Sequence, residues 1–107
     1  MSNPDPVVAL VAERFALEAA CEAKIRGRGP DETHAIVEKT AGQIGHLDDR
    51  IAGIVATSAA GVIGQLRVLR EICEGVYADD DVHHSRDCAD RLMASIAAGV
   101  DQLGARE

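Results

Sequence analysis

The chain has 107 residues, of which 47% are hydrophobic, 27% charged and 2% aromatic, and its formal net charge is −7. This length fits a single domain, and a compact monomer of this size would have a radius of gyration of about 13 Å. Nucleic acids and anionic membrane surfaces both bind a basic face. Because the basic residues here are scattered among acidic ones, neither a nucleic acid nor a membrane is expected as a partner.

The apolar residues are of the kind that packed helices use. Phe15 and Tyr77 are the only aromatic residues, and alanine is abundant beside leucine, isoleucine and valine. Alanine and leucine favour helices, whereas sheets favour β-branched and aromatic side chains. We therefore expect an all-α protein.

The N-terminal segment and the cysteines bear on localisation. Residues 1–6 are polar and carry two prolines, unlike a secretory signal, and no run approaches the ~20 apolar residues of a membrane span. Cys21, Cys73 and Cys88 each lie inside an apolar helical pattern. We expect three reduced thiols in the core of a cytoplasmic protein.

The first predicted helix covers residues 6–26. Asp5 can cap it, and Pro6 is tolerated in a first turn, where its missing N–H would be unpaired. Two glycines and a proline at residues 27–30 predict where it ends. One face carries Val7, Val8, Val11, Phe15 and Ala19.

The second predicted helix covers residues 31–54, after Pro30. Its apolar positions follow spacings of three and four, which is typical of a coiled-coil seam. These positions are Val37, Thr40, Ile44, Leu47, Ile51 and Ile54. The positions expected to face solvent are Glu38, Lys39, Asp48, Asp49 and Arg50.

The third predicted helix covers residues 58–77, with Thr57 or Ser58 as its N-cap. Its seam is Val62, Leu66, Leu69, Cys73 and Val76. The step of eight residues from Ile54 to Val62 breaks the phase of the preceding seam. A tight turn at residues 55–58 explains that break, and a kink in one long helix is the alternative.

The fourth predicted helix covers residues 84–103, after a polar connection at residues 78–84. Its apolar face is Ala89, Leu92, Ile96, Val100 and Leu103. Four helices of about 30 Å with short connections predict an antiparallel four-helix bundle or a pair of helical hairpins.

Several glycines fall inside the predicted helices, where each costs ~1 kcal/mol relative to alanine. They are Gly42, Gly45, Gly53, Gly61, Gly64 and Gly99. Close approach of neighbouring helices is the expected reason for keeping them. A ligand lying against bare backbone is the alternative.

One segment of the chain resembles a segment of other proteins. It reads Ala56-Thr57-Ser58-Ala59-Ala60-Gly61-Val62, followed by Gln65-Leu66-Arg67. It is similar to a Pro-Ala-Thr-Thr-Leu-Ala-Gly-Leu segment, followed by Lys or Arg, in small uncharacterised bacterial all-helical proteins. The match covers about a dozen of the 107 residues, and Val55 stands where those proteins have proline. The resemblance implies a helical protein with a capped third helix and implies no activity.

Pairs of histidine and acid are the candidate metal ligands. Asp80 and His83, and likewise Asp81 and His84, lie three residues apart, and such pairs can bind a metal. The Glu-x-x-His motif of di-iron bundles is absent from the sequence. Capping and solvation are the expected roles of these side chains, and no cofactor is expected.

The serines and Cys88 are the candidate nucleophiles of the sequence. Ser58, Ser85 and Ser95 lie in helical contexts without a Gly-x-Ser-x-Gly elbow. Cys88 follows His84 by four residues and could share a face with it, although a buried thiol is the expected reading. No catalytic residue is assigned.

Two functional hypotheses follow. The first and third predicted helices carry more apolar surface than one seam uses, which favours a non-enzymatic interaction or scaffold protein that forms a homo-oligomer or binds another helical protein. The alternative is a regulatory bundle that binds a small ligand or a metal. That alternative depends on the small-residue faces around Gly61 and Gly64 and on the acidic and histidine residues at 79–84.

Overall fold

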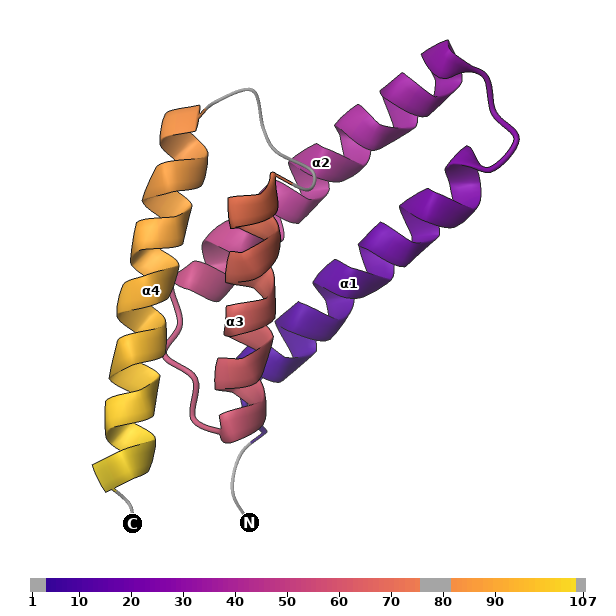
Figure 1. Cartoon of the computed structure of the whole chain (residues 1–107). Helices are drawn as coiled ribbons and strands as arrows, with labels where there is room; N and C mark the ends of the chain where they lie inside the picture. The colour runs from indigo at the N-terminus through magenta and orange to yellow at the C-terminus, as the bar shows by residue number, and fades with distance from the viewer. Residues whose placement is uncertain (1–3, 76–81, 106–107) are drawn as a thin grey trace.

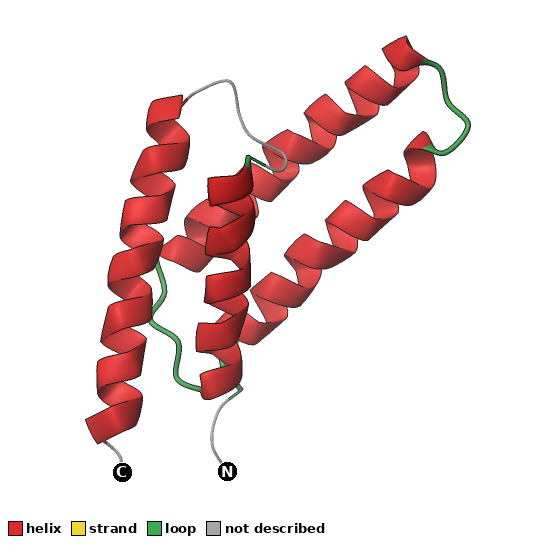
Figure 2. Cartoon of the chain, viewed as in Figure 1, coloured by secondary structure: helices red, strands yellow, loops and turns green. Residues whose placement is uncertain are grey.

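A computed structural model describes residues 4–75 and 82–105, which form four α-helices (Figure 1). The helices are α1 (Pro6–Ile25), α2 (Pro30–Ala52), α3 (Ala59–Glu74) and α4 (Val82–Ala105). Within these two ranges there is no strand (Figure 2). The prediction of an all-α fold with four helices is confirmed.

The helices are arranged as two pairs. α1 and α2 lie side by side, as do α3 and α4, and the first pair extends away from the second toward the connection between α1 and α2 (Figure 1). α1 also packs on α3, and α2 packs on α4. The radius of gyration is 15.1 Å and the principal extents are 53 × 32 × 17 Å. The chain is therefore more extended than a compact monomer of this length.

The predicted signals at the ends of α1 are present. The Asp5 carboxylate accepts a hydrogen bond of 3.0 Å from the backbone N–H of Val7, which caps the helix. After Ile25 the chain leaves the helix, and Gly27 has φ of 73°. This left-handed conformation is one that glycine adopts without steric cost.

A turn, and not a kink, separates α2 from α3. Residues 53–58 are not helical, and Gly53 closes α2 with backbone hydrogen bonds to Arg50 and Ile51. Ser58 caps α3 by accepting a hydrogen bond of 3.1 Å from the N–H of Gly61. The predicted end of the second helix at residue 54 was therefore two residues too late.

Two other predicted boundaries were also displaced. α3 ends at Glu74 because Gly75 takes a left-handed conformation with φ of 76° and caps it. α4 begins at Val82, although residues up to 84 were assigned to a polar connection. Val76, the last predicted seam position of the third helix, lies outside the described residues.

The core lies where the two helix pairs meet. The seam predicted for α2 is confirmed at Thr40, Ile44, Leu47 and Ile51, all of which are buried. The remaining buried apolar residues come from all four helices and the turn after α2. They are Val7, Leu10, Val11, Cys21, Ala52, Ala56, Val62, Val68, Cys88 and Leu92.

The predicted faces of α1, α3 and α4 were wrong in part. Val8, Leu66 and Val100 are 42%, 47% and 52% exposed, and Cys73 and Ala19 are exposed as well. The buried face of α3 instead carries Gly61, Val62, Gly64, Gln65 and Val68. Glycine and glutamine contribute nothing to a hydrophobic pattern, so the sequence could not indicate that this face turns inward.

Two glycines, Gly64 and Gly99, confirm the prediction of close helix approach. A Cβ at Gly64 would lie 3.1 Å from both methyl carbons of Val11 on α1, and one at Gly99 would lie 3.2 Å from a methyl carbon of Val62 on α3. A Cβ at Gly61 would collide with the Asp5 carboxylate. The prediction was wrong for Gly42 and Gly45, since a Cβ at either would meet no atom within 4 Å, and Gly53 lies after the end of α2.

Candidate functional site

A buried charge cluster joins three helices at the side chain of Arg14, which is 0% exposed. Its Nε donates a hydrogen bond of 2.9 Å to Asp48 of α2. Its Nη1 donates to Glu18 of α1 at 2.7 Å and also to Glu71 of α3. We call these four residues the Arg14 cluster.

The Arg14 cluster holds three carboxylates around one guanidinium group. Burial raises the pKa of Asp48 above its usual value of 3.8, in spite of the hydrogen bond and charge of Arg14, and the charge of Glu71 adds to the rise. Burial also raises the pKa of Glu18 above 4.5, and Glu71 beside it acts in the same direction. The cluster therefore binds a proton more readily than the same groups do in the unfolded chain.

Asp48 was predicted to face solvent, and that prediction was wrong. Its carboxylate is buried because it pairs with Arg14, which shares a helical face with Val7, Leu10 and Val11. The one local signal was the spacing of four between Arg14 and Glu18. The decisive contacts come from other helices and have no signature in the local sequence.

Replacing Glu18 with glutamine is expected to flatten the dependence of stability on pH. A raised carboxyl pKa stabilises the folded chain most below the unfolded value of 4.5, and this contribution is lost as the pH rises through the folded pKa. The variant lacks this group, so its midpoint in urea should fall less than that of the parent chain between pH 4 and pH 7. Glu22→Gln, at an exposed position of the same helix, is the control. An equal pH dependence in Glu18→Gln and the parent chain would refute the raised pKa of Glu18.

A second group of polar contacts fixes the turn between α2 and α3. The second carboxylate oxygen of Asp5, which does not bond Val7, accepts hydrogen bonds from the N–H of Thr57 at 3.0 Å and from the hydroxyl of Ser58 at 2.7 Å. Asp5 therefore caps α1 and also holds the residues that begin α3. The chain enters both helices at one junction.

The carbonyl groups at the end of α2 are also satisfied by side chains. Gln65 of α3 donates to the carbonyls of Ile51 and Ile54 at 3.1 and 2.7 Å, as expected for a buried glutamine. Ser95 of α4 donates to the carbonyl of Ala52 at 2.6 Å. These bonds tie α3 and α4 to the end of α2.

The predicted metal candidates fall largely outside the described chain. Asp80 and Asp81 lie outside the described residues, and so do the side chains of His83 and His84 in the first turn of α4. Among the side chains that the structure describes, no three of histidine, cysteine, aspartate or glutamate are grouped so as to hold a metal.

Three of the candidate catalytic residues are buried or hydrogen-bonded to the backbone. Burial raises the pKa of the Cys88 thiol to about 11, so that it stays protonated at neutral pH and is a poor nucleophile. The hydroxyl groups of Ser58 and Ser95 are engaged at the ends of α3 and α2. Cys21 is buried as predicted, whereas the exposed Cys73 contradicts a core role for all three thiols.

Large apolar side chains are exposed on α3 and α4. Ile63 and Leu66 of α3 are 58% and 47% exposed, and Met93 and Val100 of α4 are 49% and 52% exposed. Spacings of three and seven residues place each pair on one face of its helix. We call these four residues the apolar face.

Three residues of the apolar face adjoin positions that pack on the core. Leu69 of α3 and Ile96 and Leu103 of α4 are half-buried against the core. They lie three or four residues from Leu66, Met93 and Val100, and so beside them on the helical wheel, whereas Ile63 lies farther round α3. These three exposed residues therefore extend the apolar stripe of each helix outward from the core.

No helix within the described ranges is long and apolar enough to cross a membrane. Comparison of the chain with family models, with curated proteins and with solved structures finds no match.

Proposed function

We propose that this chain is a non-enzymatic helical interaction protein that self-associates, with α1–α2 and α3–α4 as two antiparallel hairpins and the apolar face as the contact. The apolar face is the observation that carries the proposal. Isolated exposed apolar residues are ordinary on a protein surface, but large ones gathered on adjoining helices favour an interface.

The dimensions of the α3–α4 pair limit how strong the contact is. Two helices about 10 Å apart offer a face about 20 Å wide, and 16 residues of α3 extend about 24 Å. This gives about 500 Å² per chain, or about 1,000 Å² for two chains, at the low end for a specific interface. A weak dimer is therefore expected, and it should be sought at high micromolar concentration.

The charge around the apolar face suits a polar rim. Arg70 and Glu74 at the C-terminal end of α3 form an exposed ion pair of 3.0 Å. Such a pair keeps the end of the face solvated while its centre is covered. The alternative partner for the apolar face is another helical protein, in place of a second copy of this chain.

Replacing Leu66 with glutamate is expected to abolish self-association and to leave the fold intact. The side chain is already half exposed, so the substitution should change the free energy of unfolding by no more than about 0.5 kcal/mol. A charge at the centre of the contact would have to be desolvated without a partner. Val100→Glu should act in the same way. Light scattering and native mass spectrometry at high micromolar concentration measure the subunit number.

Ala94→Glu is the matched control, because it adds the same charge to an exposed position on a different face of α4. It should leave the dimer in place. A parent chain that is strictly monomeric at high micromolar concentration would refute self-association. Equal weakening of the dimer by all three substitutions would show that the apolar face is not the contact.

A further inference from the structure

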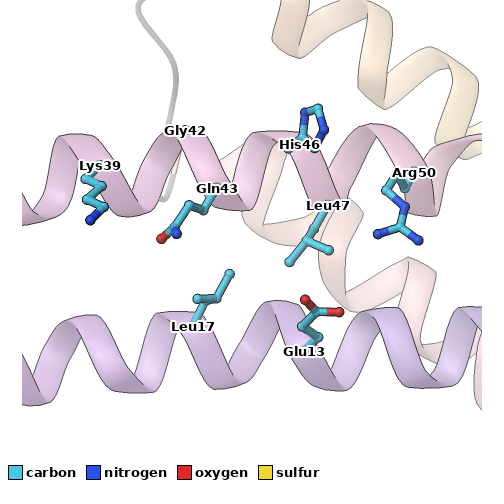
Figure 3. A pocket seen from close by; sticks show the side chains of 8 residues that line it. All are labelled: Glu13, Leu17, Lys39, Gly42, Gln43, His46, Leu47 and Arg50. Atoms are coloured by element: carbon cyan, nitrogen blue, oxygen red, sulfur yellow. The ribbon is translucent and has the colours of Figure 1, made fainter.

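An open groove runs between α1 and α2, with a volume of about 540 Å³ (Figure 3). This lies within the range of small-molecule sites. Lys39 and Arg50 project from α2 toward α1, whereas the ring of His46 points away from α1 (Figure 3). The other lining residues are Glu13 and Leu17 of α1, and Gly42, Gln43 and Leu47 of α2.

The charge of the groove is opposite to that of the chain. The net charge is −7 with histidine neutral, yet the groove is lined by two cations, Lys39 and Arg50, and one acid, Glu13. Among the described residues, neither Lys39 nor Arg50 forms an ion pair. Two unpaired cations on one wall of a groove are suited to binding an anion.

The middle of the groove is apolar and open. Leu17 and Leu47 face each other from the two helices (Figure 3). Gly42 adds no side chain, and a Cβ built there would meet no atom within 4 Å. Gly42 therefore leaves the space beside Lys39 and Gln43 open without serving a helix contact, unlike Gly64.

The positions of the charges favour a ligand that is charged at its ends. Lys39 and Arg50 are eleven residues apart, about 16 Å along the helix axis, and their long side chains can reach toward each other. Glu13 projects from α1 toward Leu47 (Figure 3) and disfavours negative charge in the middle of the groove. A single compact anion would not use both cations at once.

We propose that the α1–α2 groove binds a linear organic dianion, with its two anionic groups at Lys39 and Arg50 and its aliphatic body against Leu17 and Leu47. Gln43, which points toward α1 (Figure 3), supplies a hydrogen bond along the same wall. This site is separate from the apolar face of α3 and α4, so it does not depend on self-association.

Titration of the full chain with suberate, an eight-carbon dicarboxylate, tests the proposal at constant ionic strength. Amide shifts in ¹H–¹⁵N NMR spectra should saturate and concentrate at residues 39–50 and 13–17. Lys39→Gln and Arg50→Gln should each weaken binding about tenfold, as expected for loss of one charge-assisted contact. Octanoate, with one carboxylate, should bind about tenfold more weakly than suberate. Glu13→Gln should tighten binding.

Three further variants test the effects of net charge and of filling the groove. Arg86→Gln removes the same charge from an exposed position of α4 and should leave the affinity unchanged. Gly42→Leu should fill the groove and abolish binding, whereas Gly45→Leu, outside the groove, should not. Circular dichroism establishes that each variant is helical. Absence of saturable shifts, or equal affinity for suberate, octanoate and inorganic phosphate, would overturn the proposal.

Discussion

Replacing Arg14 with methionine is expected to lower the free energy of unfolding by about 3–5 kcal/mol at neutral pH, the cost typical of breaking a buried ion pair by removing one partner. Methionine fills much of the same volume, so the loss comes mainly from charge. Asp48 would remain buried without the guanidinium group that now donates to it at 2.9 Å. Glu18 and Glu71 would face each other without a cation between them.

Urea denaturation followed by circular dichroism measures this loss, with Arg86→Met at an exposed position of α4 as the control. The loss should shrink at low pH, because protonation removes the unpaired charges of Asp48 and Glu18. Arg14→Met combined with Asp48→Leu should recover part of the stability, since it removes both charges and leaves an apolar contact. A loss below about 1 kcal/mol in the single variant at neutral pH would contradict the burial of this pair.

Much of the fold could be predicted because its signals are local. Asp5 and Ser58 cap the helices that follow them, and glycines end α1, α2 and α3 where the sequence changes character. The seam of α2 keeps spacings of three and four across the whole helix. Each of these features depends on residues within one or two turns of one another.

The orientation of α3 could not be predicted because glycine contacts set it. Gly61 and Gly64 face α1 since only a residue without a side chain fits against Asp5 and Val11. The pattern of large apolar residues instead indicated the face that carries Leu66, which is exposed. A hydrophobic pattern measures how apolar a face is, not how closely another helix can approach it.

The candidate sites depend on contacts between distant segments. Arg14 binds Asp48 and Glu71, which lie 34 and 57 residues after it in the sequence. The groove exists only because α1 and α2 lie side by side. The sequence did indicate excess apolar surface on the third helix, and the exposed Ile63 and Leu66 agree with that expectation.

Replacing Asp5 with alanine is expected to cost about 2–4 kcal/mol of stability. Loss of an N-cap alone costs about 0.5–2 kcal/mol. Asp5 also accepts charge-assisted hydrogen bonds from Thr57 and Ser58, each of a kind worth about 1.5–3 kcal/mol when buried and less at this half-buried site. Asp31→Ala, in the exposed first turn of α2, removes an acid of the same type without these bonds and should cost less than about 1 kcal/mol.

The pH dependence of the Asp5→Ala effect distinguishes the loss of hydrogen bonds to the Asp5 carboxylate from a packing defect. Burial opposes ionisation of Asp5, but the hydrogen bonds from Ser58, Val7 and Thr57 outweigh it and lower the pKa below 3.8. A lowered pKa contributes stability above the unfolded value, and the contribution is lost as the pH falls through the folded pKa. The difference between parent and variant should therefore be largest above pH 5 and shrink below pH 3.8.

This sign is opposite to that of Glu18 and Asp48, whose raised pKa values make the contribution of these two carboxyl groups largest in acid. Urea midpoints of the parent chain, Asp5→Ala and Glu18→Gln from pH 3 to pH 7 distinguish the contribution of Asp5 from that of the Arg14 cluster. A constant difference between the parent chain and Asp5→Ala across this range would assign the loss to packing. A difference that disappears in acid would assign it to the carboxylate that joins the start of α1 to the start of α3.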